Sequence, residues 1–226
     1  MDNFPDAPHF DCDGLLYSNR FDDHYFSRHD GRAECAHVFL AGNELPGRWS
    51  HCKCFTIGEL GFGTGLNFLE TWANWQRKRQ PGQRLHFVSV EAYPLHRDVA
   101  RQALDAWPQL QSLADQLLAA WHQLDRPIAL DPQTILDIRV GDVEETLCDF
   151  PMIEAWYLDG FSPSKNPKMW SAEVMETIAN HTVPGGTFAS YTSAGWVRRN
   201  LEAAGFRVEK RPGFGKKREM IAGRKS

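Results

Sequence analysis

The stretch CFTIGELGFGTGLNFLETW, residues 54–72, decides the fold. It opens with a short apolar run that ends in glycine, a pattern typical of a buried strand followed by a turn. Three glycines then stand at alternate positions: Gly61, Gly63 and Gly65. Apolar residues next recur at separations of three, which predicts a helix with Leu66, Leu69, Trp72 and Trp75 on one face. A strand, a glycine turn and a helix in direct succession indicate an α/β protein.

The rest of the chain repeats this alternation. We expect strands at residues 54–61, 85–92, 134–142, 155–161 and 185–193, and a closing hairpin at 206–223. Helices are expected at 64–79, 94–107, 108–124, 143–150, 172–182 and 195–205, the last ending at Gly205. The pattern predicts a Rossmann-like domain over residues 51–226, with a mostly parallel seven-stranded sheet and helices on both faces. Residues 1–50 are expected to form a small N-terminal extension packed on it.

Composition narrows the class of protein. The chain has 226 residues, 42% of them hydrophobic, which suffices for a sizeable core. It lacks a basic, apolar leader and any apolar stretch near 18 residues, so we expect a soluble, cytoplasmic protein without a membrane anchor. The five cysteines are scattered and odd in number, which favours reduced thiols. His51, Cys52 and Cys54 lie close in sequence, but a metal site would need a fourth ligand at a plausible spacing and none is found, so structural cysteines and no metal site are expected.

Charge is unevenly distributed along the chain. The net charge is −4, which argues against a uniformly basic nucleic-acid coat. Residues 198–226, however, carry ten Lys and Arg against three Glu. This excess of seven positive charges at one end is suited to a polyanion.

Four acids end or follow four successive strands: Glu59, Glu91, Asp142 and Asp159. In open parallel sheets, ligands bind at the carboxyl ends of strands, where Glu91 could accept the hydroxyls of a ribose. Asp142 could accept a proton from an adenine amino group, or it could cap the helix that follows. The glycines allow the backbone of the loop to approach a ligand closely. Acids repel phosphates but suit a cationic nucleoside, so S-adenosylmethionine fits better than NAD or ATP.

A second motif, LDGFSPSKNPKMW at residues 158–170, follows the fourth expected strand. It places Asp159 and Phe161 at the strand end, in a loop that Pro163 and Pro167 stiffen. Lys165 is expected to meet a phosphate or carboxylate rather than to act as a base. Asn166 is expected to be a hydrogen-bonding loop residue.

Four segments together resemble the methyltransferase half of the MnmC family, bacterial enzymes that finish 5-methylaminomethyl-2-thiouridine at the tRNA wobble position. They are GELGFGTGLNFLETW, LDGFSPSKNPKMW, TSAGWVRRNLEAAGF and KRPGFGKKREM. FDDHYFS at residues 21–27 and HVFLAGNELPGRW at 37–49 resemble its N-terminal region. The resemblance extends from about residue 16 to residue 223, and generic methyltransferases do not share its motifs.

This resemblance implies a class I methyltransferase fold, S-adenosylmethionine as methyl donor and the amine of 5-aminomethyl-(2-thio)uridine at tRNA position 34 as acceptor. It implies that Gly61, Gly63 and Gly65 hold the methionine part of the donor, Glu91 the ribose and Asp142 the adenine end. MnmC continues into an FAD-dependent oxidase, whereas this sequence stops at Ser226. A stand-alone enzyme and a domain of a longer one both fit, and we expect neither flavin nor oxidase chemistry here.

Methyl transfer to nitrogen needs a neutral amine, and an alkylamine is mostly protonated at neutral pH. Asp159 is the expected group that accepts this proton or orients the amine, and its alternative role is that of a helix or turn cap in DGFSP. Phe161 is either a wall for the uracil ring or the methyl group, or a core residue. Tyr191 with the FDDHYF segment either completes the acceptor pocket or packs structurally. The basic end offers a phosphate surface for the anticodon stem-loop: Arg198, Arg199, Lys210, Arg211, Lys216, Lys217 and Arg218. An enzyme that supplies the aminomethyl group is the expected functional partner.

Two other functions remain compatible with the sequence. One is a small-molecule N-methyltransferase, or an aminopropyltransferase that uses decarboxylated S-adenosylmethionine. The basic carboxyl end argues against a polycationic acceptor. The other is a non-catalytic tRNA-binding module that keeps a methyltransferase shell, against which the four strand-end acids argue.

Overall fold

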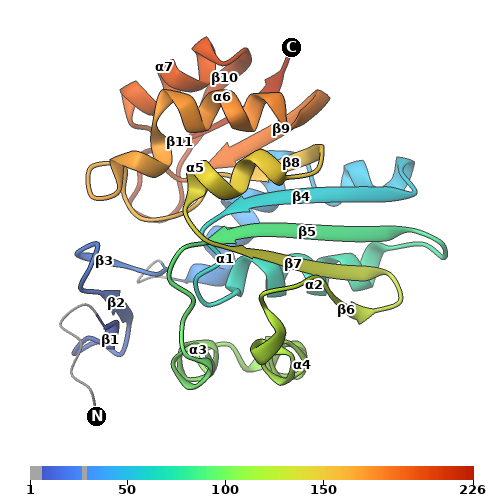
Figure 1. The fold of residues 1–226 in the computed structure, drawn as a ribbon, viewed down its shortest axis with the longest axis vertical. Coiled ribbons are helices and arrows are strands. Elements are labelled where there is room, and N and C mark those ends of the chain that lie inside the picture. The colour runs from blue at the N-terminus through green and yellow to red at the C-terminus, as the bar shows by residue number, and fades with distance from the viewer. Residues whose placement is uncertain (1–6, 27–29) are drawn as a thin grey trace.

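The computed structural model describes residues 7–26 and 30–226. Its main sheet has eight strands in the order β10-β11-β9-β8-β4-β5-β7-β6 (Figure 1). The bounds are β4 Cys54–Leu60, β5 Arg84–Glu91, β6 Ile128–Asp131, β7 Thr134–Val140, β8 Ile153–Tyr157, β9 Thr182–Ser190, β10 Phe206–Pro212 and β11 Glu219–Lys225. Strands β7, β5, β4, β8 and β9 are parallel to one another, while β6, β10 and β11 pair antiparallel. The predicted α/β fold with a mostly parallel sheet is confirmed.

Helices cover both faces of this sheet, as Figure 1 shows. They are α1 Gly31–Cys35, α2 Leu66–Lys78, α3 Arg97–Leu104, α4 Gln111–Ala119, α5 Val143–Thr146, α6 Ala172–Asn180 and α7 Gly195–Ala203. Short 3₁₀ or π-helical turns lie at Ala36–Leu40, Ala41–Asn43, Gly47–His51, Pro108–Leu110, Trp121–Gln123, Leu147–Asp149 and Pro167–Trp170. Consecutive residues of a strand point to opposite faces, so Tyr157 packs in the core beneath α2, α3 and α4, and Trp156 in the core beneath α5, α6 and α7.

The N-terminal region forms a small antiparallel sheet of β1 (His9–Phe10), β2 (Leu16–Ser18) and β3 (Asp23–His24), followed by α1. Leu16, Val38 and Trp49 are buried in the same apolar core as Trp72 of α2. Residues before the first main strand therefore help to form the core of the Rossmann-like domain. Residues 1–6 of the expected extension, and Ser27 of the FDDHYFS motif, lie outside the described residues.

The structure differs from the sequence-based expectation in three elements. The helix expected over residues 143–150 is shorter, because α5 ends at Thr146 and a 3₁₀ turn follows at Leu147–Asp149. The eighth strand, β6, is a four-residue edge strand that hairpins onto β7, and it is too short to stand out by pattern. The helix expected over residues 108–124 is interrupted, because α4 ends at Ala119 and a 3₁₀ turn begins at Trp121. Leu117 and Trp121 are nevertheless buried, so the apolar stripe survives the break.

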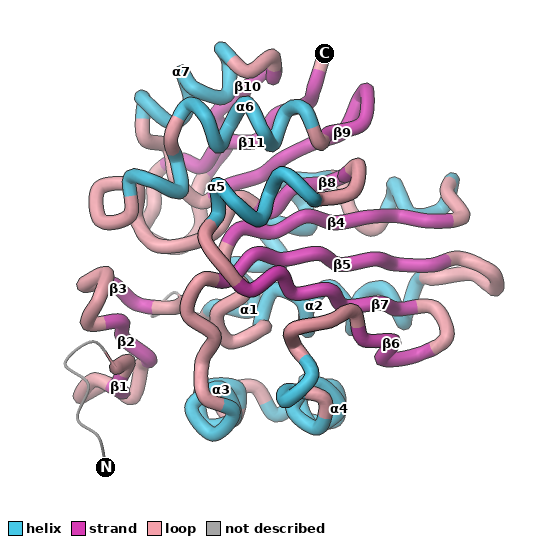
Figure 2. Tube along the Cα trace, viewed as in Figure 1, coloured by secondary structure: helices cyan, strands magenta, loops and turns pink. Residues whose placement is uncertain are grey.

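The loops that follow β4, β5, β7 and β8 gather at one edge of the sheet, as Figure 2 shows. Because β11 runs antiparallel to β9, the turn between β10 and β11 returns to this same edge. Strands β1 to β3 lie beside it (Figure 1). The chain thus brings its N-terminal segment, its strand-end acids and its basic carboxyl-terminal turn together.

Candidate active site

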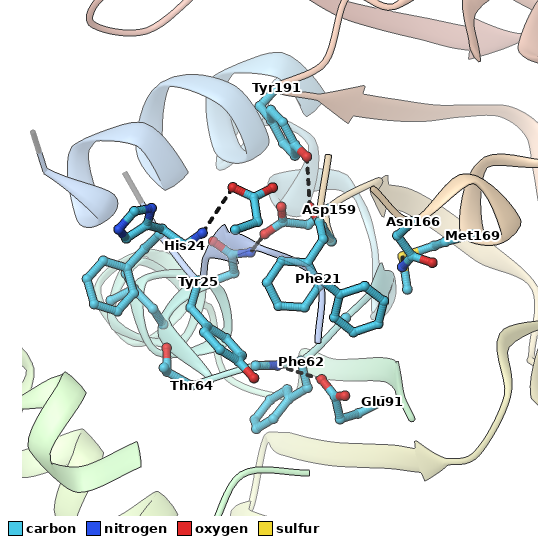
Figure 3. A pocket seen from close by; sticks show the side chains of 18 of the residues that line it. Phe21, His24, Tyr25, Phe62, Thr64, Glu91, Asp159, Asn166, Met169 and Tyr191 are labelled. Carbon is cyan, nitrogen blue, oxygen red and sulfur yellow. Dashed lines mark hydrogen bonds between the residues drawn. The ribbon is translucent and has the colours of Figure 1, made fainter. Parts of the chain in front are cut away.

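A cavity of about 570 Å³ opens at this edge. Its size lies within the range of small-molecule pockets. Seven of the predicted pocket residues line it: Gly61, Gly63, Glu91, Asp142, Asp159, Phe161 and Tyr191. Asn166, expected as a hydrogen-bonding loop residue, and Lys216 and Lys217, expected on the phosphate surface, line it too. Figure 3 shows Asp159 and Tyr191 toward one end and Phe62 and Glu91 toward the other, with Phe21 and Tyr25 between them. The cavity therefore has room for two ligand parts next to each other.

The glycine loop after β4 requires glycine at its centre. Gly63 has φ +54°, and a Cβ there would lie 3.3 Å from the ring of Tyr25. A side chain at Gly63 would therefore meet both backbone strain and a ring that lines the cavity. Directly after the loop, α2 begins at Leu66 and directs its first, unpaired N–H groups toward this edge.

Glu91 lies at the carboxyl end of β5. Its Oε2 accepts the backbone N–H of Gly63 at 2.9 Å, and its Oε1 accepts that of Tyr93 at 2.8 Å. Burial raises the pKa of Glu91, while these backbone donors act in the opposite direction. A carboxylate has about four lone-pair positions, so each oxygen can accept one further hydroxyl.

Asp142 performs the capping role that competed with cofactor binding. One carboxylate oxygen accepts the backbone N–H of Glu144 at 3.0 Å and so caps α5. The other lies 2.8 Å from Lys168 Nζ, and this ion pair lowers the pKa of Asp142. Asp142 also lines the cavity, so its predicted contact with an adenine is compatible with the cap.

Asp159 is held by a short polar network that leads from the cavity into the protein interior. Asn67 Nδ2 donates to Asp159 Oδ2 at 2.7 Å and to Glu59 Oε1 at 3.0 Å. Ser89 Oγ donates to the other oxygen of Glu59 at 2.7 Å. Since Asn67 gives N–H groups to two acids, its amide orientation is fixed. Burial raises the pKa of Asp159 to about 7, although the Asn67 hydrogen bond opposes this.

Glu59 does not line the cavity, which changes the role expected for it. Its side chain is fully buried, and burial raises its pKa well above the usual range. The contact it makes toward the site is the hydrogen bond from Asn67. The structure thus gives Glu59 a supporting position behind Asn67 in place of direct contact with a ligand.

A second group of side chains near Asp159 consists of Tyr191, Lys217 and Glu34. The Tyr191 hydroxyl donates to the Gly160 carbonyl at 2.8 Å, and Lys217 Nζ lies 4.0 Å from the centre of the Tyr191 ring. Lys217 Nζ also lies 2.8 Å from Glu34 Oε1, which joins the β10–β11 turn to α1. Charge on Glu34 raises the pKa of Asp159, and charge on Lys217 lowers it.

Aromatic rings divide the cavity. Phe161 stacks on Phe21 with ring centres 4.5 Å apart and meets Tyr25 edge-on at 5.1 Å. Phe21 also lies 6.0 Å from Tyr93, the residue two positions after Glu91. These flat apolar surfaces are suited to a purine or pyrimidine ring.

The loop that carries Asp159 and Phe161 is fastened to the N-terminal segment. Asp23 Oδ2 accepts the Ser162 backbone N–H at 3.0 Å, and Lys165 pairs with Asp22. Lys165 does not line the cavity. Its observed contact is the carboxylate alternative that the sequence allowed, and its phosphate contact stays a prediction.

The basic residues of the carboxyl end divide into two groups. Some already have acidic partners: Lys210 with Glu219, Arg211 with Glu209, Arg198 with Glu202 and Lys217 with Glu34. Within the described part of the chain, Arg199, Lys216 and Arg218 are exposed and have no ion pair. Lys216 and Arg218 lie in the turn at the cavity edge, whereas Arg199 lies on α7.

Sequence reasoning missed Asn67 and Glu34. Asn67 carried one signal, because it is a polar side chain in the first turn of the helix that follows the glycine loop. Glu34 carried none, since its approach to Asp159 depends on how the five-residue helix α1 docks over the cavity.

Two other kinds of site are absent from the described residues. Across residues 7–26 and 30–226, no helix has both the length and the apolar character of a membrane span. The same residues contain no group of three or more His, Cys, Asp or Glu side chains arranged for a metal ion. All five cysteines are free thiols.

The parallel sheet, the glycine loop after β4 and the acids at the strand ends define a class I S-adenosylmethionine-dependent methyltransferase. The model of a family described as S-adenosyl-L-methionine-dependent methyltransferases matches residues 108–226, more than half of the chain. The chain belongs to this family.

The chain is similar to proteins named tRNA 5-methylaminomethyl-2-thiouridine biosynthesis bifunctional protein MnmC. It is 46% identical to that of Chromohalobacter salexigens over 98% of this chain and 32% of the relative. It is 45% identical to that of Caulobacter sp. over 92% of this chain and 36% of the relative. The chain thus spans about a third of the length of the curated relatives it matches. The solved structure of MnmC2 from Aquifex aeolicus shares the fold, with a TM-score of 0.73 and 21% identity over 96% of this chain and 69% of that one.

Proposed function

We propose that this chain transfers a methyl group from S-adenosylmethionine to the amine of 5-aminomethyl-(2-thio)uridine at position 34 of tRNA. The observation that carries the proposal is that one cavity is lined by the glycine loop, Glu91 and Asp159, with Glu91 and Asp159 toward opposite ends. A donor and an acceptor bound at these two ends would meet near Phe161. The names of the similar MnmC proteins support the choice of acceptor.

The donor end suits S-adenosylmethionine. Glu91 keeps lone pairs for ribose hydroxyls after accepting two backbone N–H groups. Gly61 and Gly63 line the cavity where a ligand can approach the loop, and Asp142, which lines the same cavity, supplies the carboxylate proposed to accept the adenine amino proton. When bound, S-adenosylmethionine supplies a methyl group on a cationic sulfur, which leaves that sulfur as the new carbon–nitrogen bond forms.

The acceptor end suits an amine. An alkylamine with a pKa near 10.4 is protonated at neutral pH and has no free lone pair. A carboxylate whose pKa is raised to about 7 is a stronger base than an ordinary aspartate. Asp159 therefore accepts the amine proton, while the Asn67 hydrogen bond holds its Oδ2 in place and leaves Oδ1 for the amine.

The β10–β11 turn is the proposed contact with RNA phosphates. Lys216 and Arg218 are exposed and free of ion pairs in the described structure, and Lys216 lines the cavity, so this turn would hold the phosphates of the anticodon stem-loop. Phe214 lines the cavity below them and offers a ring on which a base could stack. A cytoplasmic location and a partner enzyme that supplies the aminomethyl group complete the proposal.

The test is transfer from labelled S-adenosylmethionine to RNA. Anticodon stem-loops bearing unmodified, aminomethyl and carboxymethylaminomethyl uridine are offered separately, followed by nucleoside analysis. We expect label on the aminomethyl nucleoside and none on unmodified uridine. Asp159→Asn should abolish transfer without abolishing donor binding in calorimetry. Label on a free polyamine in place of RNA would overturn the proposal, and absence of donor binding by the wild type would indicate a non-catalytic module.

A further inference from the structure

Glu34 stands at the acceptor end of the cavity without a role in the chemistry described above. It lies on α1, its side chain is only 12% exposed, and it lines the cavity together with Asp159. A carboxylate in so sheltered a position requires a counter-charge. Lys217 provides it at 2.8 Å, from the turn at the opposite end of the chain.

The Glu34–Lys217 pair is fixed in place around Asp159. Lys217 Nζ rests over the Tyr191 ring at 4.0 Å, and the Tyr191 hydroxyl is bonded to the carbonyl of Gly160, the residue next to Asp159. The pair is close enough that both of its charges act on Asp159. Asp159, Glu34 and Lys217 therefore form one electrostatic unit at the acceptor end.

The charges of this unit add up to −1 when Asp159 is ionised. Two further charged lining residues belong to the segments that border Asp159: Asp23, which accepts the Ser162 N–H, and Lys216, the neighbour of Lys217 in sequence; their charges are opposite and offset each other. A net charge of −1 is complementary to one ammonium group. An amine that also carries a carboxylate is a zwitterion. Its negative carboxylate would lie beside the negative Glu34, and Lys217 could not offset this repulsion because it is already paired with Glu34.

We propose that Glu34 determines acceptor specificity: with Asp159 it binds a cationic primary amine, and by occupying Lys217 it rejects an amine that bears a carboxylate. This inference rests on the function proposed above. Glu34 acts on binding of the acceptor, whereas proton transfer remains with Asp159.

The experiment compares two anticodon stem-loops that differ only in this charge. Aminomethyl RNA is the substrate, with its KM measured, and carboxymethylaminomethyl RNA is the competitor, with its inhibition constant Ki measured. The ratio of Ki to KM isolates the uridine side group, because every other RNA contact is common to both. Catalysis on the competitor is not required.

Glu34→Gln should lower this ratio at least about tenfold, since a neutral residue 34 leaves Lys217 free to receive the carboxylate. Lys217→Gln should raise the ratio at least about threefold, because Glu34 then repels the carboxylate without compensation. Glu176→Gln, an exposed change on α6, should leave it at the wild-type value. Calorimetry with S-adenosylmethionine checks that each variant is folded.

Failure of this inference and failure of the proposed function are distinguishable. If the wild type does not methylate aminomethyl RNA, the proposed function itself is wrong. If it does, and Glu34→Gln keeps the wild-type ratio, the specificity role of Glu34 is overturned. Should Glu34→Gln lose donor binding through misfolding, an unchanged or lowered ratio in Lys217→Gln overturns the inference independently.

Discussion

Replacing Asp159 with asparagine should make the protein more stable and less active. The pKa of Asp159 is 3.8 without perturbation and about 7 in the folded chain. A raised folded-state pKa means that Asp159 favours folding least when it is ionised. The stability that protonated Asp159 contributes, relative to the ionised form, is fully present below pH 4 and is lost as the pH rises through 7.

The size of the effect follows from these two values. Because its pKa is raised on folding, Asp159 lowers the free energy of unfolding, relative to an aspartate with an unshifted pKa, by about 1.7 kcal/mol at pH 5 and about 4.3 kcal/mol at pH 8. Water in the cavity screens part of the charge, so both values are upper bounds. An asparagine side chain at this position cannot ionise, yet its carbonyl oxygen can still accept the N–H of Asn67 that Asp159 accepts at 2.7 Å. Asp159→Asn should therefore gain up to about 2.5 kcal/mol of unfolding free energy over the wild type between pH 5 and pH 8.

Urea unfolding followed by tryptophan fluorescence at pH 5 and pH 8 measures this gain, and methyl transfer by the same samples measures activity. The matched control is Asp125→Asn, an exposed aspartate remote from the cavity lining. It should change stability by less than about 0.5 kcal/mol at either pH. A variant Asp159→Asn whose advantage over the wild type is the same at both pH values would refute the reasoning.

Three further outcomes follow from the cavity and its edge. Glu91→Gln removes a charged acceptor of the Gly63 and Tyr93 N–H groups, so calorimetry should show S-adenosylmethionine binding about 10- to 100-fold weaker. Gly63→Ala places a Cβ 3.3 Å from Tyr25 at φ +54° and should weaken donor binding, whereas Gly82→Ala, at φ +84° with open space around it, should lower the melting temperature without affecting the donor. Lys216→Ala should reduce the slope of log K against log salt for tRNA binding by about 0.7 to 0.9, whereas Lys78→Ala on α2 should not; equal slopes for both would remove the turn from the RNA surface.

The strand-end acids illustrate what could be predicted from sequence. Glu91, Asp142 and Asp159 were located because a short apolar run, followed directly by an acid and a glycine or helix start, is a local pattern. Once the strands are parallel, their carboxyl ends share one edge, so side chains at those ends must lie close together. Glu59 shows the limit of this argument. It ends β4 by pattern, but its side chain points into the interior behind Asn67.

The basic carboxyl end shows a similar limit. Its charge excess was visible in the sequence, but which of its cations are free was not. Lys217 is paired with Glu34, 183 residues earlier in the chain, and this pairing exists only because α1 and the β10–β11 turn meet over the cavity. No spacing rule connects two such positions.

By itself, the sequence determined the alternation of the five parallel strands with helices, the glycine loop and the edge at which the site forms, because these depend on hydrophobic periodicity and on the backbone freedom of glycine over a few residues. Tertiary structure alone decided which charges surround Asp159. The pKa of that carboxyl depends on burial and on Asn67, Glu34 and Lys217, which come from three separate segments of the chain. Electrostatic energy depends on distance in space and on exclusion of water, and both are set only when those segments pack together.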